Sequence, residues 1–258
     1  MPPRALAIGD FIMRIRPAPL AVLLKWLLFV RRHELATPEG KFWVDTASYQ
    51  GNTLARHGVY EPDLLATVKS YLKPGGTFVD VGANEGYFSV VAAKTVGPGG
   101  RVLAIEPQSR LQRVLLRNFA LNSCQQVTLV AAAVSDHAGQ ASLHLTPGVN
   151  NSASSLVRPT RYPLFRQIVP TLRLAEILDQ AGIDTCDLMK IDVESWEYEA
   201  VLGSKDLFRS GRVRALALEL HPPLLAARGL DPAAITRFLD DCGYREVPGL
   251  RHLLLVKS

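Results

Sequence analysis

Short apolar runs alternate with amphipathic segments along most of the chain, and this alternation predicts an α/β fold. The apolar runs cover residues 77–81, 101–106, 127–134, 187–193 and 214–221. Runs of this length between turn residues are typical of strands that are buried on both faces of a parallel sheet. The intervening segments place apolar residues at helical spacing, as in residues 109–121. We therefore expect a mostly parallel, doubly wound sheet.

The last part of the chain predicts a hairpin, because residues 244–247 and 252–257 flank the turn Pro248-Gly249. A last strand that inserts antiparallel follows from this arrangement. Before the first long strand, the pattern predicts a short strand at 42–45, a polar link at 52–57 and a helix at 63–72. Tyr60 and Glu61 precede this helix, and they either border a ligand pocket or only cap the helix.

Residues 147–170 lack periodicity and are rich in Asn, Ser, Pro and Arg, so they predict a long loop after a short strand at 141–145. Its amides and hydroxyls at 150–155 suit a sugar-like substrate, and Arg158, Arg161 and Arg166 suit an acidic group. A solvated linker is the alternative. We expect the next helix to start near residue 169 and to end near residue 180.

The N-terminal segment is unusually apolar. Residues 20–30 form an apolar run that Lys25 interrupts, with Arg14, Arg16, Arg31 and Arg32 on its flanks. The run is too short to cross a bilayer, and no small-residue cleavage site follows it. It predicts either a helix packed on the domain or an interfacial helix whose arginines meet anionic lipid. A signal or anchor segment is a third interpretation.

We expect residues 1–57 to form this N-terminal extension and residues 58–258 to form the main domain. The three cysteines are far apart and have no C-x-x-C spacing, which favours a reducing compartment. The protein is therefore expected in the cytoplasm, with peripheral membrane contact through residues 14–32 as an open alternative. The oligomeric state cannot be inferred from the sequence.

The first long strand leads into a glycine turn. Gly82 and Gly86 allow the backbone to turn tightly and to approach a ligand, and a helix at 87–96 follows. A strand, a glycine turn and a helix form the entrance to a doubly wound sheet, where ligands bind beyond the carboxyl ends of the strands.

An acid at the end of the second strand indicates the kind of ligand. Glu106 lies 20 residues after Gly86, where a carboxylate can accept both hydroxyls of a ribose. The turn is G-x-x-x-G and lacks the G-x-G-x-x-G pattern that binds a pyrophosphate. Asp80 before the turn favours a ligand with a cationic amine. These features favour S-adenosylmethionine (SAM) over NAD; a glycine turn without a cofactor is the remaining alternative.

Composition narrows the function further. The net charge of +5 is moderate, and the arginines of residues 109–121 are typical of a solvated helix face. Nucleic-acid binding would require an extended basic stripe or interleaved aromatics, so we predict no nucleic-acid partner. The six histidines are scattered without ligand spacing, and we predict no metal.

Polar side chains gather at the ends of the later strands. Lys190, Asp192 and Glu194 fall on one side of their strand, and three aligned charges are costly unless they are paired or line a cleft. His221 ends the neighbouring strand; it is a candidate base, or it only shapes the turn before Pro222. We predict that these four residues orient the substrate or act as a general base.

Three segments, Phe78–Ser89, Ala104–Pro107 and Met189–Glu197, resemble the motifs of the FkbM family of SAM-dependent methyltransferases in order and spacing. The resemblance runs from about residue 58 to residue 256. It implies a Rossmann-like class I methyltransferase fold and O-methylation, often of sugars or other hydroxylated metabolites. One residue departs from the family pattern: Ser195 follows Asp-Val-Glu where glycine is usual, which narrows the pocket or strains the backbone.

The cofactor is then S-adenosyl-L-methionine, and the acceptor is a hydroxyl on a small molecule or glycan. In this fold class the exit of the third strand, with Ala133 and Ser135, usually holds the adenine. The residues expected at the cofactor are Asp80, Gly82, Asn84, Gly86, Glu106, Ala133 and Ser135. The alternatives are a methyltransferase-like domain that binds without catalysis, which Ser195 keeps open, and an NAD-dependent oxidoreductase.

Overall fold

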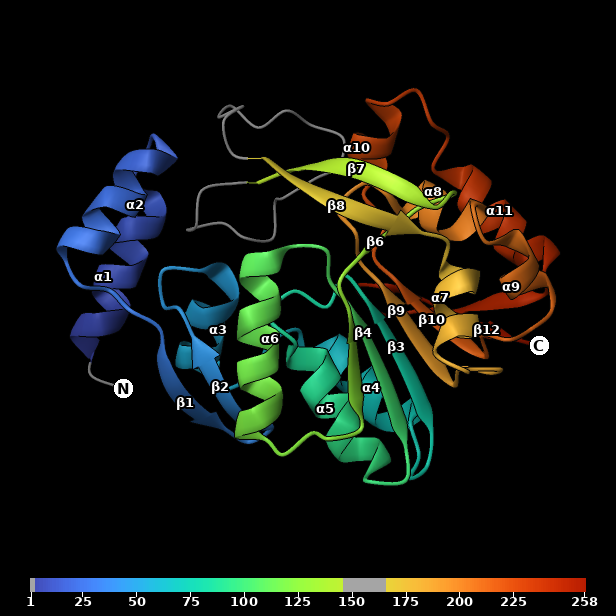
Figure 1. Ribbon diagram of the computed structural model, residues 1–258, viewed down its shortest axis with the longest axis horizontal. Coiled ribbons are helices and arrows are strands. Elements are labelled where there is room, and N and C mark those ends of the chain that lie inside the picture. Colours follow the sequence, from blue (N-terminus) through green and yellow to red (C-terminus); the bar gives the residue numbers. More distant parts are fainter. Residues whose placement is uncertain (1–2, 146–165) are drawn as a thin grey trace.

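A seven-stranded sheet forms the centre of the protein in the computed structural model, which describes residues 3–145 and 166–258 (Figure 1). The strand order is β11-β12-β10-β9-β3-β4-β5. Five neighbouring strands are parallel: β10 (Ala215–Leu218), β9 (Leu188–Ile191), β3 (Thr77–Val81), β4 (Arg101–Ile105) and β5 (Val127–Val130). The predicted mostly parallel sheet of a Rossmann-like class I methyltransferase fold is confirmed.

The C-terminal hairpin completes this sheet. β12 (Leu253–Lys257) inserts antiparallel between β10 and β11 (Tyr244–Val247). The last strand is thus antiparallel, as the hairpin pattern predicted, and the chain ends inside the sheet.

Two apolar layers explain why the central strands have continuous apolar sequences. Phe78 belongs to the core on one face of the sheet, while Val79 and Val81 belong to the core on the other face. Alternate residues of a strand point to opposite faces, so a strand covered by helices on both sides must be apolar at every position.

Helices cover both faces (Figure 1). The first face packs against α4 (Pro62–Tyr71), α5 (Tyr87–Val96) and α6 (Ser109–Leu121). The second face packs against α7 (Leu174–Gln180), α8 (Glu197–Leu202), α9 (Lys205–Arg209), α10 (Pro222–Ala226) and α11 (Ala233–Asp241).

A small second sheet corrects two of the predictions. β6 (Ala133–Val134), β8 (Arg166–Leu172) and β7 (Gly139–His144) form a three-stranded sheet in the order β6-β8-β7. The single strand expected at 127–134 is wrong, because β5 loses its partner where β4 ends and the chain leaves for the second sheet. The loop expected up to residue 170 and the helix start near 169 are also wrong, because residues 166–171 pair with β7 and Leu172 pairs with β6.

The other residues predicted in that loop, from 147 to 165, lie outside the described part of the chain. This includes the amides and hydroxyls at 150–155 and two of the three arginines, Arg158 and Arg161.

The N-terminal segment contains α1 (Pro3–Arg14), α2 (Ala18–Leu27), the hairpin β1 (His33–Thr37) and β2 (Gly40–Val44), and α3 (Tyr49–His57). The strand expected at 42–45 is confirmed. The polar link expected at 52–57 is wrong, because these residues belong to α3. Ser48 caps the start of α3 by accepting a hydrogen bond from the Gly51 N–H at 3.1 Å. Its polar residue Asn52 is buried and donates to Asp10 at 3.0 Å.

Part of this segment belongs to the main core. Phe42, Val44 and Leu54 pack in the same apolar layer as Phe78. The asparagine Asn118 of α6 accepts from the backbone N–H of Trp43 at 2.7 Å. The domain boundary at residue 58 stays a prediction, and these contacts favour an earlier one.

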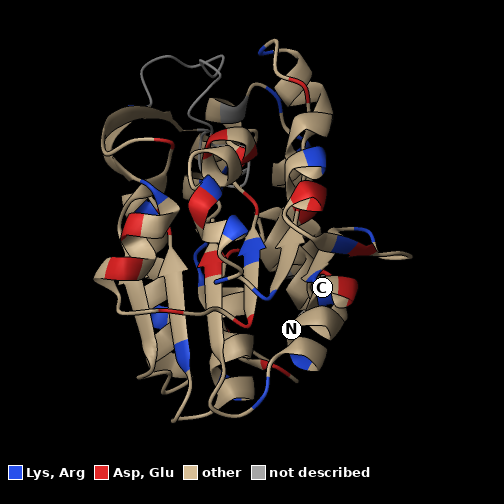
Figure 2. Ribbon diagram, turned by 90° about the vertical axis from the view of Figure 1, so that its right-hand side faces the viewer, with Lys and Arg blue, Asp and Glu red and all other residues tan. Residues whose placement is uncertain are grey.

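Two further observations bear on partners. Among the described residues, no helix has the length and apolar content needed to cross a membrane. Lys and Arg are intermixed with Asp and Glu on the side that carries α9 and α11 (Figure 2). Such mixing is typical of a solvated surface, and the absence of a nucleic-acid partner stays a prediction.

Candidate active site

A cavity of about 590 Å³ lies at the carboxyl ends of the central strands. Its wall includes the residues that directly follow β3, β4, β9 and β10: Gly82, Glu106, Asp192 and Glu219. The carboxyl ends of parallel strands meet at one edge of the sheet, so residues far apart in the sequence converge there.

Gly82 must be glycine for two reasons. Its φ is 78°, in the left-handed region that favours glycine. A Cβ at this position would also lie 1.9 Å from the carbonyl oxygen of Asp192. The turn after β3 therefore packs directly against the chain that leaves β9.

Lys190 stabilises this turn by a hydrogen bond to its backbone. Its Nζ donates to the carbonyl oxygen of Gly82 at 2.9 Å and lies 3.5 Å from Asp80 and 3.6 Å from Asp192. Burial lowers the pKa of the Lys190 ammonium, but the carboxylates of Asp192 and Asp80 outweigh it and hold the pKa above its usual value. Lys190 is thus a fixed cation that orders the turn and is unsuited to accept a proton.

Asp80 lies beneath the cavity and outside its wall. Its carboxylate is buried, and Ser89 of α5 donates to it at 2.7 Å. Strand alternation turns Asp80 toward α5, the face opposite to that of its neighbours Val79 and Val81. The structure therefore places Asp80 with Lys190 in the support of the turn and not on the cavity wall, and its role at the cofactor stays a prediction.

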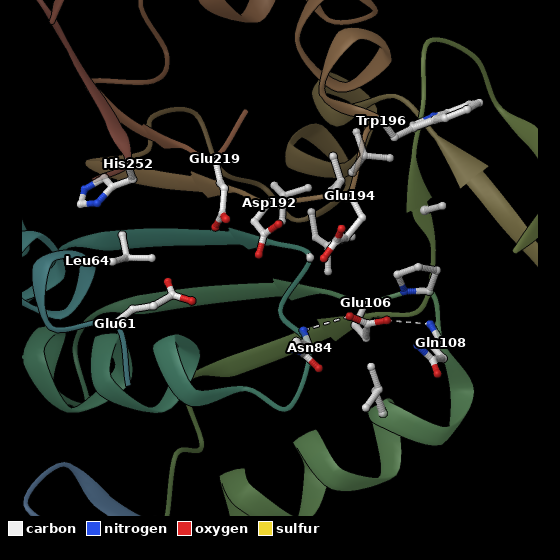
Figure 3. Close-up of a pocket in the computed structure, with 18 of the residues that line it drawn as sticks. Glu61, Leu64, Asn84, Glu106, Gln108, Asp192, Glu194, Trp196, Glu219 and His252 are labelled. Carbon is white, nitrogen blue, oxygen red and sulfur yellow. Dashed lines mark hydrogen bonds between the residues drawn. The ribbon is translucent and has the colours of Figure 1, made fainter. Parts of the chain in front are cut away.

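Glu106 is the buried acid of the other half of the cavity (Figure 3). One of its oxygens accepts from the backbone N–H of Asn84 at 2.9 Å and the other from Gln108 at 2.8 Å. Burial raises its pKa to about 7, although these two bonds favour the ionised form. Each carboxylate oxygen has a second lone pair, so Glu106 can still accept hydrogen bonds from a ligand.

Several carboxylates face the remaining part of the cavity (Figure 3). They come from the start of α4 and from the ends of β9 and β10: Glu61, Asp192, Glu194 and Glu219. Burial, together with the charge of Asp192, raises the pKa of Glu194 to about 7 and that of Glu219 to about 6. This half is rich in hydrogen-bond acceptors of different acidity.

His221 stands behind these acids and is held by a buried glutamate. Its Nδ1 lies 2.9 Å from Glu197, which is fully buried, and its Nε2 lies 3.8 Å from Glu194 and 4.0 Å from Glu219. The hydrogen bond to Glu197 raises the pKa of His221 to about 9, although burial opposes the shift. The imidazole is therefore largely protonated near neutral pH.

The turn after β9 contains Ser195, the residue that departs from the family pattern. Glu194 and Ser195 have φ of 49° and 79°, both in the left-handed region. The backbone N–H of Ser195 donates to Glu197 at 2.9 Å, and Arg228 donates to the Ser195 carbonyl oxygen at 2.6 Å. The expectation of a strained backbone at Ser195 fits this geometry.

A metal ion could be held at one point of the site. Asp192, Glu194 and His221 each offer a ligand atom, and these atoms lie within 4.8 Å of one another. Oxygen and imidazole ligands of this kind suit several divalent cations. Spacing in the sequence did not reveal this group, because its three residues come from two strand ends; the absence of a metal stays a prediction.

The predicted residues thus separate into two sets. Those on the cavity wall are Gly82, Asn84, Glu106, Ala133, Asp192 and Glu194. Those that are not on the wall are Asp80, Gly86, Ser135, Lys190 and His221. Tyr60 and Glu61, which were candidates for the border, line the cavity.

Other wall residues were missed. Gln108, Trp196, Glu219 and His252 line the cavity as well. Gln108 could have been found, since it starts the turn after the acid Glu106 and donates to it. His252 had no local signal, because only the insertion of β12 brings it to Thr67 of α4, at 3.1 Å.

Comparison with known proteins identifies the family. A family model described as the methyltransferase FkbM domain matches residues 80–246, which is more than half of the chain and includes residues from both halves of the cavity. This chain belongs to the FkbM methyltransferase domain family. The match covers the turn at Gly82, the acid Glu106 and the charged group around Asp192.

Two curated relatives of this FkbM domain are similar over part of their length. "Methyltransferase sdnD" of Sordaria araneosa is 29% identical over 195 residues, which cover 64% of this chain and 72% of the relative. "AMB antimetabolite synthetase AmbE" of Pseudomonas aeruginosa is 27% identical over 184 residues, covering 58% of this chain. The matched part is only 8% of the length of AmbE.

Solved structures are similar at a more distant level. The methyltransferase FkbM from Methylobacillus flagellatus is 17% identical with a TM-score of 0.48, and the match covers 81% of this chain and 54% of that structure. The precorrin-6y C5,15-methyltransferase from Geobacter metallireducens is 15% identical with a TM-score of 0.46, and the match covers 78% of this chain and 91% of that structure. At these levels the two structures say nothing about the substrate of this FkbM domain.

Proposed function

We propose that this methyltransferase uses SAM as the methyl donor and methylates a hydroxyl group of a small, sugar-like or otherwise hydroxylated acceptor. The observation that carries the proposal is the position of Glu106. Its buried carboxylate borders the same cavity as the Gly82 turn and can accept both hydroxyls of a ribose.

The cavity wall fits the parts of SAM. Glu106 would hold the ribose, the backbone at Gly82 and Asn84 would lie against the methionine part, and Ala133 and its neighbours offer an apolar wall for the adenine. When bound, SAM supplies a methyl group that is already activated on a sulfonium. The protein then has to align the acceptor with this group and to exclude other orientations.

The acceptor half suits a molecule with several hydroxyl groups. The carboxylates of Glu61, Glu194 and Glu219 can accept hydrogen bonds from neighbouring hydroxyls and so fix the orientation of a polyol. Asp192 stands at the end of β9 beside the Gly82 turn, between the two halves. We propose that its carboxylate is the base that accepts the proton of the reacting hydroxyl, since such a nucleophile must lose its proton as the new bond forms.

Calorimetry and turnover test the proposal. SAM and its demethylated product should bind the full chain, whereas NAD should not. Glu106→Ala should weaken SAM binding by about 1–3 kcal/mol, the range for a lost hydrogen bond to a charged group. Glu246→Ala is the matched control, because Glu246 is exposed on β11, away from the cavity wall.

Turnover on a panel of hydroxylated acceptors tests the second half of the proposal. Methyl transfer to a hydroxyl would support it. Binding of NAD instead of SAM would favour the oxidoreductase alternative. SAM binding without transfer to any member of the panel would favour a domain that binds without catalysis.

A further inference from the structure

The N-terminal helices form a hairpin that is firmly docked on the domain. Ile12 of α1 and Ala21 of α2 pack with Ala47 in a small buried cluster. Asp10 pairs with Arg56 of α3. We call α1, α2 and the segment to Val30 the N-terminal hairpin; its inner side is an integral part of the structure.

The outer side of the N-terminal hairpin is apolar and exposed. Trp26 and Phe29 are each 74% exposed and Phe11 is 58% exposed, with smaller exposed fractions for Ile8, Leu20, Val22, Leu23, Leu27 and Leu28. Elsewhere in the described part of the chain, the exposed large apolar side chains are the separate residues Tyr49, Leu116, Ile168 and Val247. Many exposed apolar side chains within one short segment indicate an interaction site.

The charges around this surface are of one sign. The sequence has no Asp or Glu between Asp10 and Glu34, but it has four arginines and one lysine there. Lys25 is neutralised by Asp45, and Arg32 pairs with Glu85. Arg14, Arg16 and Arg31 remain exposed at the edge of the apolar surface, and none of them forms an ion pair with an acid in the described residues.

This combination points to one kind of partner. A second copy of the chain would bring the same cations against these cations in a symmetric contact, which is unfavourable. An anionic bilayer offers acyl chains for Trp26 and Phe29 and acidic headgroups for the arginines. Trp is also the residue type that is enriched at the membrane–water interface.

We propose that the N-terminal hairpin docks the protein on an anionic lipid surface, with the outer apolar side chains at the level of the headgroups and Arg14, Arg16 and Arg31 on the acidic lipids. This places the protein on one leaflet of a membrane without crossing it. The hairpin lies at the edge of the molecule, and α3, β1, β2 and α6 lie between it and the central sheet (Figure 1).

The inner side of the hairpin is close in the chain to the active site. Ala47 supports the hairpin from below, and Tyr49, two residues further on, lines the cavity. Residues 47–49 therefore link the packing of the hairpin to the wall of the cavity.

Vesicle co-sedimentation of the full chain tests the proposal. The protein should sediment with vesicles of phosphatidylcholine and phosphatidylglycerol, less with phosphatidylcholine alone, and progressively less as salt is raised. The double variant Trp26→Ser, Phe29→Ser should lose at least about tenfold in binding, because both side chains leave the interface. Ile168→Ser is the matched control, since Ile168 is 63% exposed on β8.

A charge-reversal variant tests the second part. Arg14→Glu with Arg31→Glu should remove the preference for phosphatidylglycerol, whereas Arg113→Glu on the exposed face of α6 should leave it unchanged. Thermal melting of each variant shows whether the fold is retained. Absence of sedimentation by the folded wild type would overturn the proposal. So would equal binding to both vesicle types, or concentration-dependent dimers that the Trp26 and Phe29 variant abolishes.

Discussion

Ser195 shows how one residue can store strain at a functional site. It holds a left-handed φ of 79° in a buried turn, fixed by Glu197 on one side and by Arg228 on the other. A residue with a Cβ costs about 1–2 kcal/mol in this region, whereas glycine adopts it freely. The turn lies next to Glu194 and Asp192, so the strain is kept where acidic groups must be positioned.

The first prediction follows from this strain. Ser195→Gly should raise the free energy of unfolding by about 1 kcal/mol, measured by urea denaturation. Ser210→Gly is the control: Ser210 has φ of −69°, and glycine there relieves no strain. Lower stability of Ser195→Gly would mean that the serine side chain contributes more than the backbone strain costs.

The second prediction concerns the base. Asp192→Asn should reduce turnover by about 10²–10⁴-fold, the range for general base catalysis. The melting temperature should change little, because Lys190 keeps its contacts with Gly82 and Asp80. A large fall in the melting temperature would instead make Asp192 a structural partner of Lys190.

The pH profile separates Asp192 from His221 as the base. The raised pKa of His221, about 9, keeps the imidazole protonated at neutral pH. A reaction that needed neutral His221 would therefore accelerate as the pH rises through 9. If Asp192 is the base, turnover should be level above about pH 8, once Glu194, with a pKa of about 7, is ionised. Continued acceleration toward pH 9, lost in His221→Gln, would contradict the assignment to Asp192.

At the scale of elements, the sequence predicted those whose pattern is local. The strands and helices of the central sheet were recognised because burial on both faces makes their sequences continuously apolar. Residues 166–172 were missed because Pro170 and the polar residues argued against a strand, and only pairing with β7 makes one. α3 was missed because its buried polar residue Asn52 hydrogen-bonds to Asp10 and Thr46, which lie outside that helix.

The third prediction tests the start of α3. Ser48→Ala removes the side-chain acceptor of the Gly51 N–H and should lower the free energy of unfolding by about 1 kcal/mol in chemical denaturation. Ser70→Ala in the exposed last turn of α4 is the control and should be neutral or slightly stabilising, since alanine favours a helix. Equal effects of the two changes would mean that the cap does not stabilise α3.

At the scale of the whole molecule, the sequence predicted the parts of the site better than their arrangement. Gly82, Glu106 and Asp192 were found because each directly follows an apolar strand. The contacts that support them could not be predicted, because only the tertiary structure brings Lys190 to Gly82 and Asp80 and brings Glu197 to His221. The exposure of Trp26 and Phe29 was equally hidden, since an apolar run looks the same whether its helix faces the core or the solvent.

One ion pair connects the segment after the N-terminal hairpin with the glycine turn of the active site. Arg32, close behind α2, binds Glu85 within the Gly82–Gly86 turn through two hydrogen bonds of 2.6 and 2.9 Å, and both side chains are largely buried. If lipid binds the hairpin and SAM binds at the turn, both would act on this one contact. We expect anionic vesicles to change the SAM affinity by about fivefold or more, the lower end of common coupling energies.

Thermodynamic reciprocity makes this expectation strict. SAM must change the affinity for vesicles by the same factor by which vesicles change the affinity for SAM. Calorimetry with and without vesicles, and sedimentation with and without SAM, measure the two factors independently. Arg32→Gln should bring both to one, and a wild type in which both are already one would show that the ion pair transmits nothing. A membrane coupled in this way would act as a second ligand, whose binding changes the affinity for SAM and is changed by it.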